Sequence, residues 1–105
     1  MANNYALKNH TQLTGSLSLG RKANSTVGDG SVAVGDYVEA SGLNSHAEGY
    51  STIASGLYSH AEGFSATSSG QCSHTEGYNT VASGTKSHAE GEYTRAFGNS
   101  SHAEG

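Results

Sequence analysis

Small and polar residues alternate along this chain in short runs that recur every seven residues from residue 28 onward. Each run ends on glycine, and a small residue, usually alanine, stands two positions before it. In the run Ser45-His46-Ala47-Glu48-Gly49, strand alternation places the serine, alanine and glycine on one face and the histidine and glutamate on the other. The pattern predicts short strands whose inner face carries only small side chains.

Two kinds of run alternate, so the full repeat is 14 residues. One kind reads Ser-His-Ala-Glu-Gly, and the other reads Thr-Ile-Ala-Ser-Gly at 52–56 and Thr-Val-Ala-Ser-Gly at 80–84. Two strands and two turns then form one coil, and coils stack at the interstrand spacing of ~4.7–4.9 Å. We predict an all-β fold, a parallel β-solenoid (β-roll) of 14-residue coils with two short strands per coil, over residues 17–105. Residues 1–16 are predicted to be an N-terminal cap or tail.

The regular glycines distinguish this repeat from other repeats. A coiled coil needs large apolar residues at two positions per heptad, and collagen needs glycine at every third residue. In a short coil, glycine supplies either a close backbone approach or a positive φ at the corner. The predicted turn glycines are Gly35, Gly42, Gly49, Gly56, Gly63, Gly70, Gly77, Gly84, Gly91 and Gly98.

Composition narrows the class of function. Hydrophobic residues make up 33% of the chain, against roughly 45–50% in globular domains, so we expect self-association to add to the backbone ladders. The net charge of −4 provides no basic surface for nucleic acid. No apolar run approaches the ~20 residues that cross a bilayer, and we expect no membrane insertion and no signal peptide in this chain. Gly28-Asp29-Gly30 lacks the lysine of a phosphate loop, so we expect no cofactor.

Histidine and glutamate recur every 14 residues, which should align each type in a column on the outer face. Stacked carboxylates repel one another, and a neighbouring histidine column can relieve this by donating hydrogen bonds or carrying charge. The two columns consist of His46, His60, His74, His88 and His102, and of Glu48, Glu62, Glu76, Glu90 and Glu104.

Other readings of these residues stay open. His-x-Glu offers imidazole and carboxylate ligands for zinc or another transition metal, although a structural ladder is the preferred interpretation. Acid–base catalysis is disfavoured because catalytic sites are singular, whereas this pair occurs five times. An ice-binding face is disfavoured because only Thr52, Thr80 and Thr94 keep their register.

A second column contains aromatic residues. Tyr50, Phe64 and Tyr78 each follow the glycine of a histidine-type run, and we expect them to stack along one edge. Glu92 interrupts the column, so the expected ladder covers at most three coils. Packing at the corner or between subunits is the preferred role, and a carbohydrate or receptor platform is the alternative.

The stretch Ser31-Val32-Ala33-Val34-Gly35 resembles the head repeats of trimeric autotransporter adhesins, and the Ser-His-Ala-Glu-Gly runs also resemble repeats of phage tail-fibre and neck-appendage proteins. The resemblance implies a left-handed parallel β-roll assembled as a homotrimer. It also implies that Val32 and Val34 pack against neighbouring subunits. Because His46 and Glu48 occupy the same repeat positions, we predict that the two columns form an intersubunit ladder.

These expectations favour a structural role over catalysis. We expect a rigid homotrimeric segment of an extracellular surface fibre or a phage virion. The alternative is an adhesin head that binds a host, cell-wall or carbohydrate ligand through its own surface, which a contiguous exposed aromatic patch would favour. An enzyme would require a pocket of non-repeated polar residues, and the sequence shows none.

Overall fold

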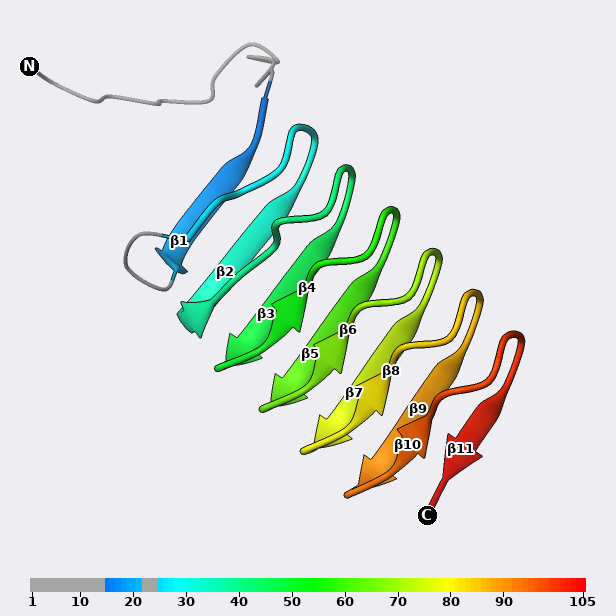
Figure 1. Ribbon diagram of the computed structural model, residues 1–105. Helices are drawn as coiled ribbons and strands as arrows, with labels where there is room; N and C mark the ends of the chain where they lie inside the picture. The colour runs from blue at the N-terminus through cyan, green and yellow to red at the C-terminus, as the bar shows by residue number, and fades with distance from the viewer. Residues whose placement is uncertain (1–14, 22–24) are drawn as a thin grey trace, which may run out of the picture.

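A computed structural model describes residues 15–21 and 25–105 as a stack of β coils (Figure 1). The described part of the chain contains strands and turns and no helix. All strand pairs are parallel, and successive coils lie 14 residues apart from β2 onward. The predicted parallel β-solenoid is therefore confirmed. Residues 1–14 of the predicted cap or tail lie outside the described residues.

The strands form two sheets, one on each side of the coil. The long sheet holds the histidine-type runs in the order β1-β2-β3-β5-β7-β9-β11, and the short sheet holds the other runs in the order β10-β8-β6-β4. The strands of the long sheet are β1 (Leu17–Arg21), β2 (Val32–Val38), β3 (His46–Tyr50), β5 (His60–Phe64), β7 (His74–Tyr78), β9 (His88–Glu92) and β11 (His102–Glu104). Those of the short sheet are β4 (Ile53–Ala54), β6 (Thr67–Ser68), β8 (Val81–Ala82) and β10 (Arg95–Ala96).

The repeat sets the register of the long sheet. From β3 to β11 each histidine pairs with the next histidine and each glutamate with the next glutamate. The first pair differs, because Leu17 lies beside Val32, 15 residues away, and the register shifts between Leu19 and Arg21. The irregularity lies where Gly20 departs from the seven-residue spacing.

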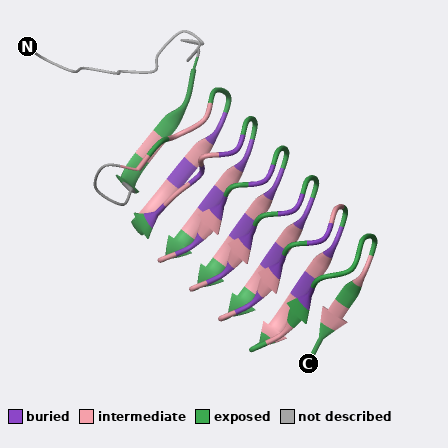
Figure 2. Ribbon diagram, in the orientation of Figure 1, coloured by how far each residue is buried: buried purple, intermediate pink, exposed green. Residues whose placement is uncertain are grey.

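Small residues fill the narrow interior between the sheets, as the alternation predicts. Figure 2 shows the buried positions in the strands, flanked by partly and fully exposed ones. The buried hydrophobic residues are alanines except for Val38, and they are at most 2% exposed. Such side chains bury little apolar area, so the backbone hydrogen bonds between coils carry much of the stability.

Buried serines close the turns. In the repeating coils the serine before each long-sheet strand donates its hydroxyl to the carbonyl oxygen of the glycine three residues earlier. These bonds are 2.6–2.7 Å long and satisfy polar groups that water cannot reach. The four serines are Ser45, Ser59, Ser73 and Ser87.

The glycines divide into two sets with different tasks. Gly42, Gly56, Gly70 and Gly84 precede the turns, and each lies against the backbone of the glycine one coil later. Gly35, Gly49, Gly63, Gly77 and Gly91 were predicted as turn glycines, but they lie within strands of the long sheet at φ values of 109–127°. This φ disturbs the strand alternation, so Gly49, Gly63 and Gly77 are exposed rather than on the predicted inner face.

The corner residues with left-handed backbone are not glycines. They lie two positions after the regular glycines and have φ of 55–60°, a region that most residues enter only at an energetic cost. Glycine spacing alone did not indicate these positions. They are Tyr37, Asn44, Ser51, Tyr58, Ser65, Cys72, Asn79, Lys86, Tyr93 and Ser100.

Candidate functional site: an outer histidine and glutamate ladder

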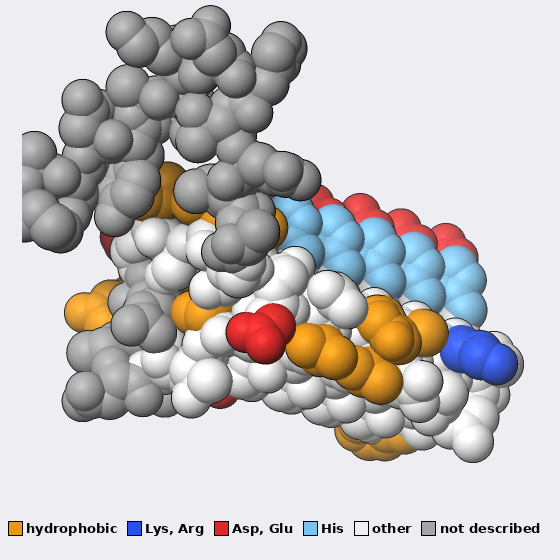
Figure 3. All heavy atoms as spheres, turned by 90° about the horizontal axis from the view of Figure 1, so that it is seen from above, with side chains coloured by type: hydrophobic (Ala, Val, Ile, Leu, Met, Phe, Trp, Pro, Cys, Tyr) orange, Lys and Arg blue, Asp and Glu red, His pale blue; other side chains and the backbone are white. Residues whose placement is uncertain are grey.

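The outer face of the long sheet carries two columns of side chains, which we call the His/Glu ladder. Five successive strands begin with histidine and place glutamate two residues later, so both side chains point away from the interior. Figure 3 shows the histidines as one continuous row with a carboxylate row beside it. The ladder consists of His46, His60, His74, His88 and His102 with Glu48, Glu62, Glu76, Glu90 and Glu104.

The same two columns are apolar at the N-terminal end of the sheet. Val32 pairs with His46 and Val34 pairs with Glu48, as the repeat match predicts. Leu17 and Leu19 extend these columns one strand further. The sequence analysis missed both leucines, because the 15-residue offset of β1 hides them from a 14-residue comparison.

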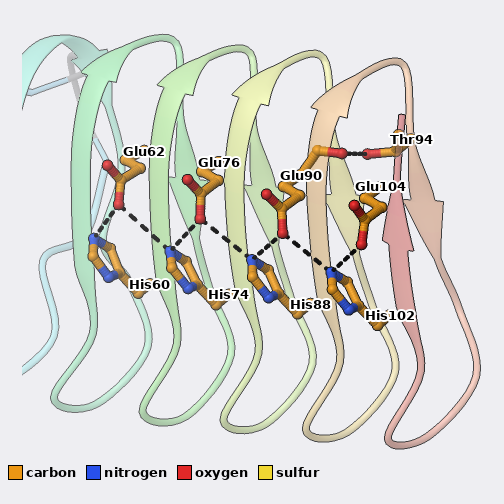
Figure 4. Close-up of polar contacts among 9 residues, drawn as sticks. All are labelled: His60, Glu62, His74, Glu76, His88, Glu90, Thr94, His102 and Glu104. Atoms are coloured by element: carbon orange, nitrogen blue, oxygen red, sulfur yellow. Dashed lines mark hydrogen bonds and ion pairs between the residues drawn. The ribbon is translucent and has the colours of Figure 1, made fainter.

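The imidazole rings stack face to face along the ladder. Neighbouring ring centroids are 4.6–4.8 Å apart, and their planes differ by 1–11°. This spacing matches the distance between adjacent strands. Each ring therefore directs its edge, with Nε2, toward the glutamate column (Figure 4).

The glutamates lie between successive histidines and form a zigzag of polar contacts. Glu62 Oε1 is 3.4 Å from Nε2 of both His60 and His74. Glu76 and Glu90 likewise reach the histidine of their own coil and that of the next, at distances of 3.1–3.8 Å. Each of these carboxylates thus joins two coils, which strand alternation alone did not indicate.

The ladder is half-exposed and rich in negative charge. The histidine side chains are 34–49% exposed, and those of Glu48, Glu62, Glu76 and Glu90 are 39–47% exposed. Two carboxylates about 5 Å apart repel each other by roughly 1 kcal/mol even in water. All the ion pairs of these carboxylates within the described residues are with histidines. The face therefore favours a bound cation or a shared proton.

His60 shows the strongest effect of its surroundings. Burial lowers the pKa of its imidazole below the ordinary value of 6.5, and repulsion from His74 and His46 lowers it further. Attraction to Glu62 and Glu48 opposes this shift without cancelling it. His60 is therefore neutral near pH 7, with its Nε2 atom buried and without a hydrogen-bond partner in the described structure.

We expect the free energy of unfolding to fall as the pH drops below 6.5. Below that pH, His60 binds a proton more readily in the unfolded chain than in the folded one, so acid favours unfolding. Urea titrations with EDTA at several pH values between about 7.5 and 5.5 would measure this slope. His60→Gln should flatten the slope more than His102→Gln, which removes a ring from the more exposed end of the row. Equal slopes in all three proteins would contradict the expectation.

A row of aromatic rings lines the corner after the long-sheet strands. Tyr50, Phe64 and Tyr78 stack with centroids 5.1 and 5.0 Å apart. The row is longer than the predicted three coils, because Tyr37 contacts Tyr50 and Tyr93 contacts Tyr78, both edge-on. Glu92 thus interrupts the sequence column, but the neighbouring Tyr93 continues the row in space. A hydrogen bond with Tyr78 raises the pKa of the Tyr93 hydroxyl.

The stacked rings present their edges to solvent. The three central rings are 42–43% exposed, yet each has neighbouring rings against both faces. Aromatic side chains that bind sugars use an open ring face, so the central rings suit packing against an apolar surface better than sugar stacking.

Two shallow hollows lie near the N-terminal end. One, of about 230 Å³, lies between residues 15–17 and 30–32, and the other, of about 300 Å³, lies beside Tyr37, Tyr50, Ser51 and Ile53. The two tyrosines are the only titratable side chains in the lining of either hollow. Neither hollow includes a residue of the His/Glu ladder.

Comparisons with known proteins address the family. The model of the YadA head domain repeat matches the chain twice, at residues 14–37 and 76–101. No curated protein and no solved structure matches the chain. The described residues include no helix long and apolar enough to cross a membrane. The two matches and the parallel β-solenoid confirm the resemblance: this chain is an array of head repeats of the trimeric autotransporter adhesin type.

Proposed function

We propose that this chain forms a rigid homotrimeric β-roll segment of a surface fibre, in a bacterial adhesin or a phage tail fibre. The supporting observation is the stacking of near-identical coils in one parallel register along both sheets. Bending such a rod would break backbone hydrogen bonds between coils. The stacked coils therefore hold whatever is attached at one end at a fixed distance from the other.

Trimer formation supplies the burial that a single chain lacks. The largest fully buried side chains of the described residues are one valine and three threonines. Large apolar side chains are meanwhile exposed, including Leu17 and Leu19 on the long-sheet face and the aromatic row at its edge. Packing the long-sheet faces of three copies together would cover Val32, Val34 and the His/Glu ladder. The family of the repeats supports three copies.

The test is the mass in solution, measured by light scattering on a sizing column. We expect three times the chain mass of 10.7 kDa. Val34→Asp should dissociate the trimer, because Val34 lies on the proposed interface. Ile53→Asp is the matched control, since Ile53 is similarly half-buried on the short sheet. A folded monomer, or equal dissociation by both variants, would contradict the proposed interface.

The exposed aromatic row favours a second candidate, an adhesin head that binds a ligand directly. Five aromatic side chains form a contiguous row and are 42–60% exposed. Binding of the intact protein to a panel of purified glycans, compared with a variant carrying Tyr50→Gln, Phe64→Gln and Tyr78→Gln, separates the two functions. Binding that the variant loses would support the adhesin, and its absence in a trimeric protein would support the spacer.

A further inference from the structure

We propose that the His/Glu ladder binds divalent transition-metal ions such as Zn²⁺. Each ion is held by the Nε2 atoms of two histidines from successive coils and by the Oε1 atom of the glutamate between them. All three donors come from one chain, so this inference does not depend on the trimer.

The donor atoms are already grouped for such a site. Four triplets in the ladder have their ligand atoms within 4.8 Å of one another, and each contains two histidines and one glutamate. Two imidazoles, one carboxylate and a water form a known tetrahedral zinc site, with metal–ligand distances of about 2.0–2.2 Å. The four triplets are His46/Glu48/His60, His60/Glu62/His74, His74/Glu76/His88 and His88/Glu90/His102.

The distances show what has to move. Ligands around a tetrahedral zinc ion lie about 3.3 Å apart, given the bond lengths of such sites. Glu62 Oε1 is already 3.4 Å from Nε2 of both His60 and His74. The two rings stack with centroids 4.7 Å apart, so their Nε2 atoms must approach each other. A tilt that moves each Nε2 by less than about 1 Å suffices, and half-exposed side chains have room for it.

Charge and protonation favour the ion. Metal ligation requires neutral imidazole and ionised carboxylate. The lowered pKa of His60 keeps that ring neutral, and its buried Nε2 lacks a hydrogen-bond partner within the described residues. Arg95, on the short sheet, donates instead to the backbone oxygens of Asn79 and Thr94. A divalent ion would offset the repulsion within the glutamate column.

Sharing of histidines limits the number of ions. Each ring directs one Nε2 atom toward the glutamates, and the three inner histidines each belong to two triplets. A histidine that holds one ion is unavailable to the next triplet. Two ions per chain are therefore the maximum for complete triplets, whether the first pair is His46 with His60 or His60 with His74.

This limit predicts an alternating effect of mutations along the row. His74→Gln leaves two separate pairs, His46 with His60 and His88 with His102, so the chain should still bind two ions. His60→Gln leaves His74, His88 and His102 in a row and isolates His46, so the chain should bind one. Both substitutions remove the same outward-facing ring from the interior of the same ladder.

The experiment is a Zn²⁺ titration followed by calorimetry and native mass spectrometry of the untagged chain. All proteins carry His10→Gln and Cys72→Ser, which remove the remaining histidine and the single cysteine. Circular dichroism checks that each variant folds. We expect two ions per chain in the parent and in His74→Gln, one in His60→Gln, and no saturable binding of Mg²⁺.

Several outcomes would overturn the inference. Absence of saturable Zn²⁺ binding by the folded parent would exclude the sites. Five ions per chain would indicate isolated His–Glu pairs instead of triplets. Equal stoichiometry in His60→Gln and His74→Gln would show that the ions are not held by histidines of successive coils.

Discussion

Gly70→Ala should destabilise the solenoid by at least about 3 kcal/mol, because the new methyl group meets backbone that cannot move aside. An alanine Cβ would overlap the carbonyl oxygen of Gly84 and lie 2.6 Å from its carbonyl carbon and 2.9 Å from that of Ser83. Relief requires the two coils to separate. Separation would break coil-to-coil bonds such as that from Gly70 N–H to the Ala82 oxygen.

Gly98→Ala is the matched control for this effect. Gly98 occupies the same repeat position two coils later, but an added Cβ would lie 3.6 Å from Ser101, an ordinary contact. We expect this variant to stay within about 1 kcal/mol of the parent. Urea unfolding at one fixed protein concentration, followed by circular dichroism, measures both. Equal losses would show that contact between coils does not explain the glycine.

Ala61→Leu should also destabilise the fold strongly, by about 3 kcal/mol, because the interior has no room for a larger side chain. Ala61 is fully buried and lies between Ala47 and Thr75 in the same inner column. The added carbons would push the long sheet away from the short sheet. Thermal and urea unfolding of the variant measure the loss.

Ala61→Thr tests whether size is the cause. Thr75 occupies the equivalent position in the next coil, where it is fully buried and its hydroxyl has no hydrogen-bond partner among the described residues. We expect threonine at residue 61 to cost only about 1–3 kcal/mol for its buried hydroxyl, and less than leucine. A leucine variant as stable as the parent would reveal unused space between the sheets.

The 14-residue repeat by itself determined the parallel register, the small interior and the two outer columns. Like residues pair with like in stacked coils, so the alignment of His46 with His60 and of Glu48 with Glu62 follows from their spacing. Strand alternation then separates these outward side chains from the buried Ser45 and Ala47. Both inferences depend only on periods that are visible along the chain.

Only the tertiary structure decided how neighbouring coils share their side chains. Rotamers and inter-coil distances place Glu62 between two histidines, which a repeat spacing does not specify. Local backbone geometry gives the left-handed corners to residues such as Tyr93, which joins the aromatic row from outside its sequence column. The offset of β1 likewise arises at an irregular register. A repeat determines which residues stack, whereas dihedral angles and packing determine which atoms meet.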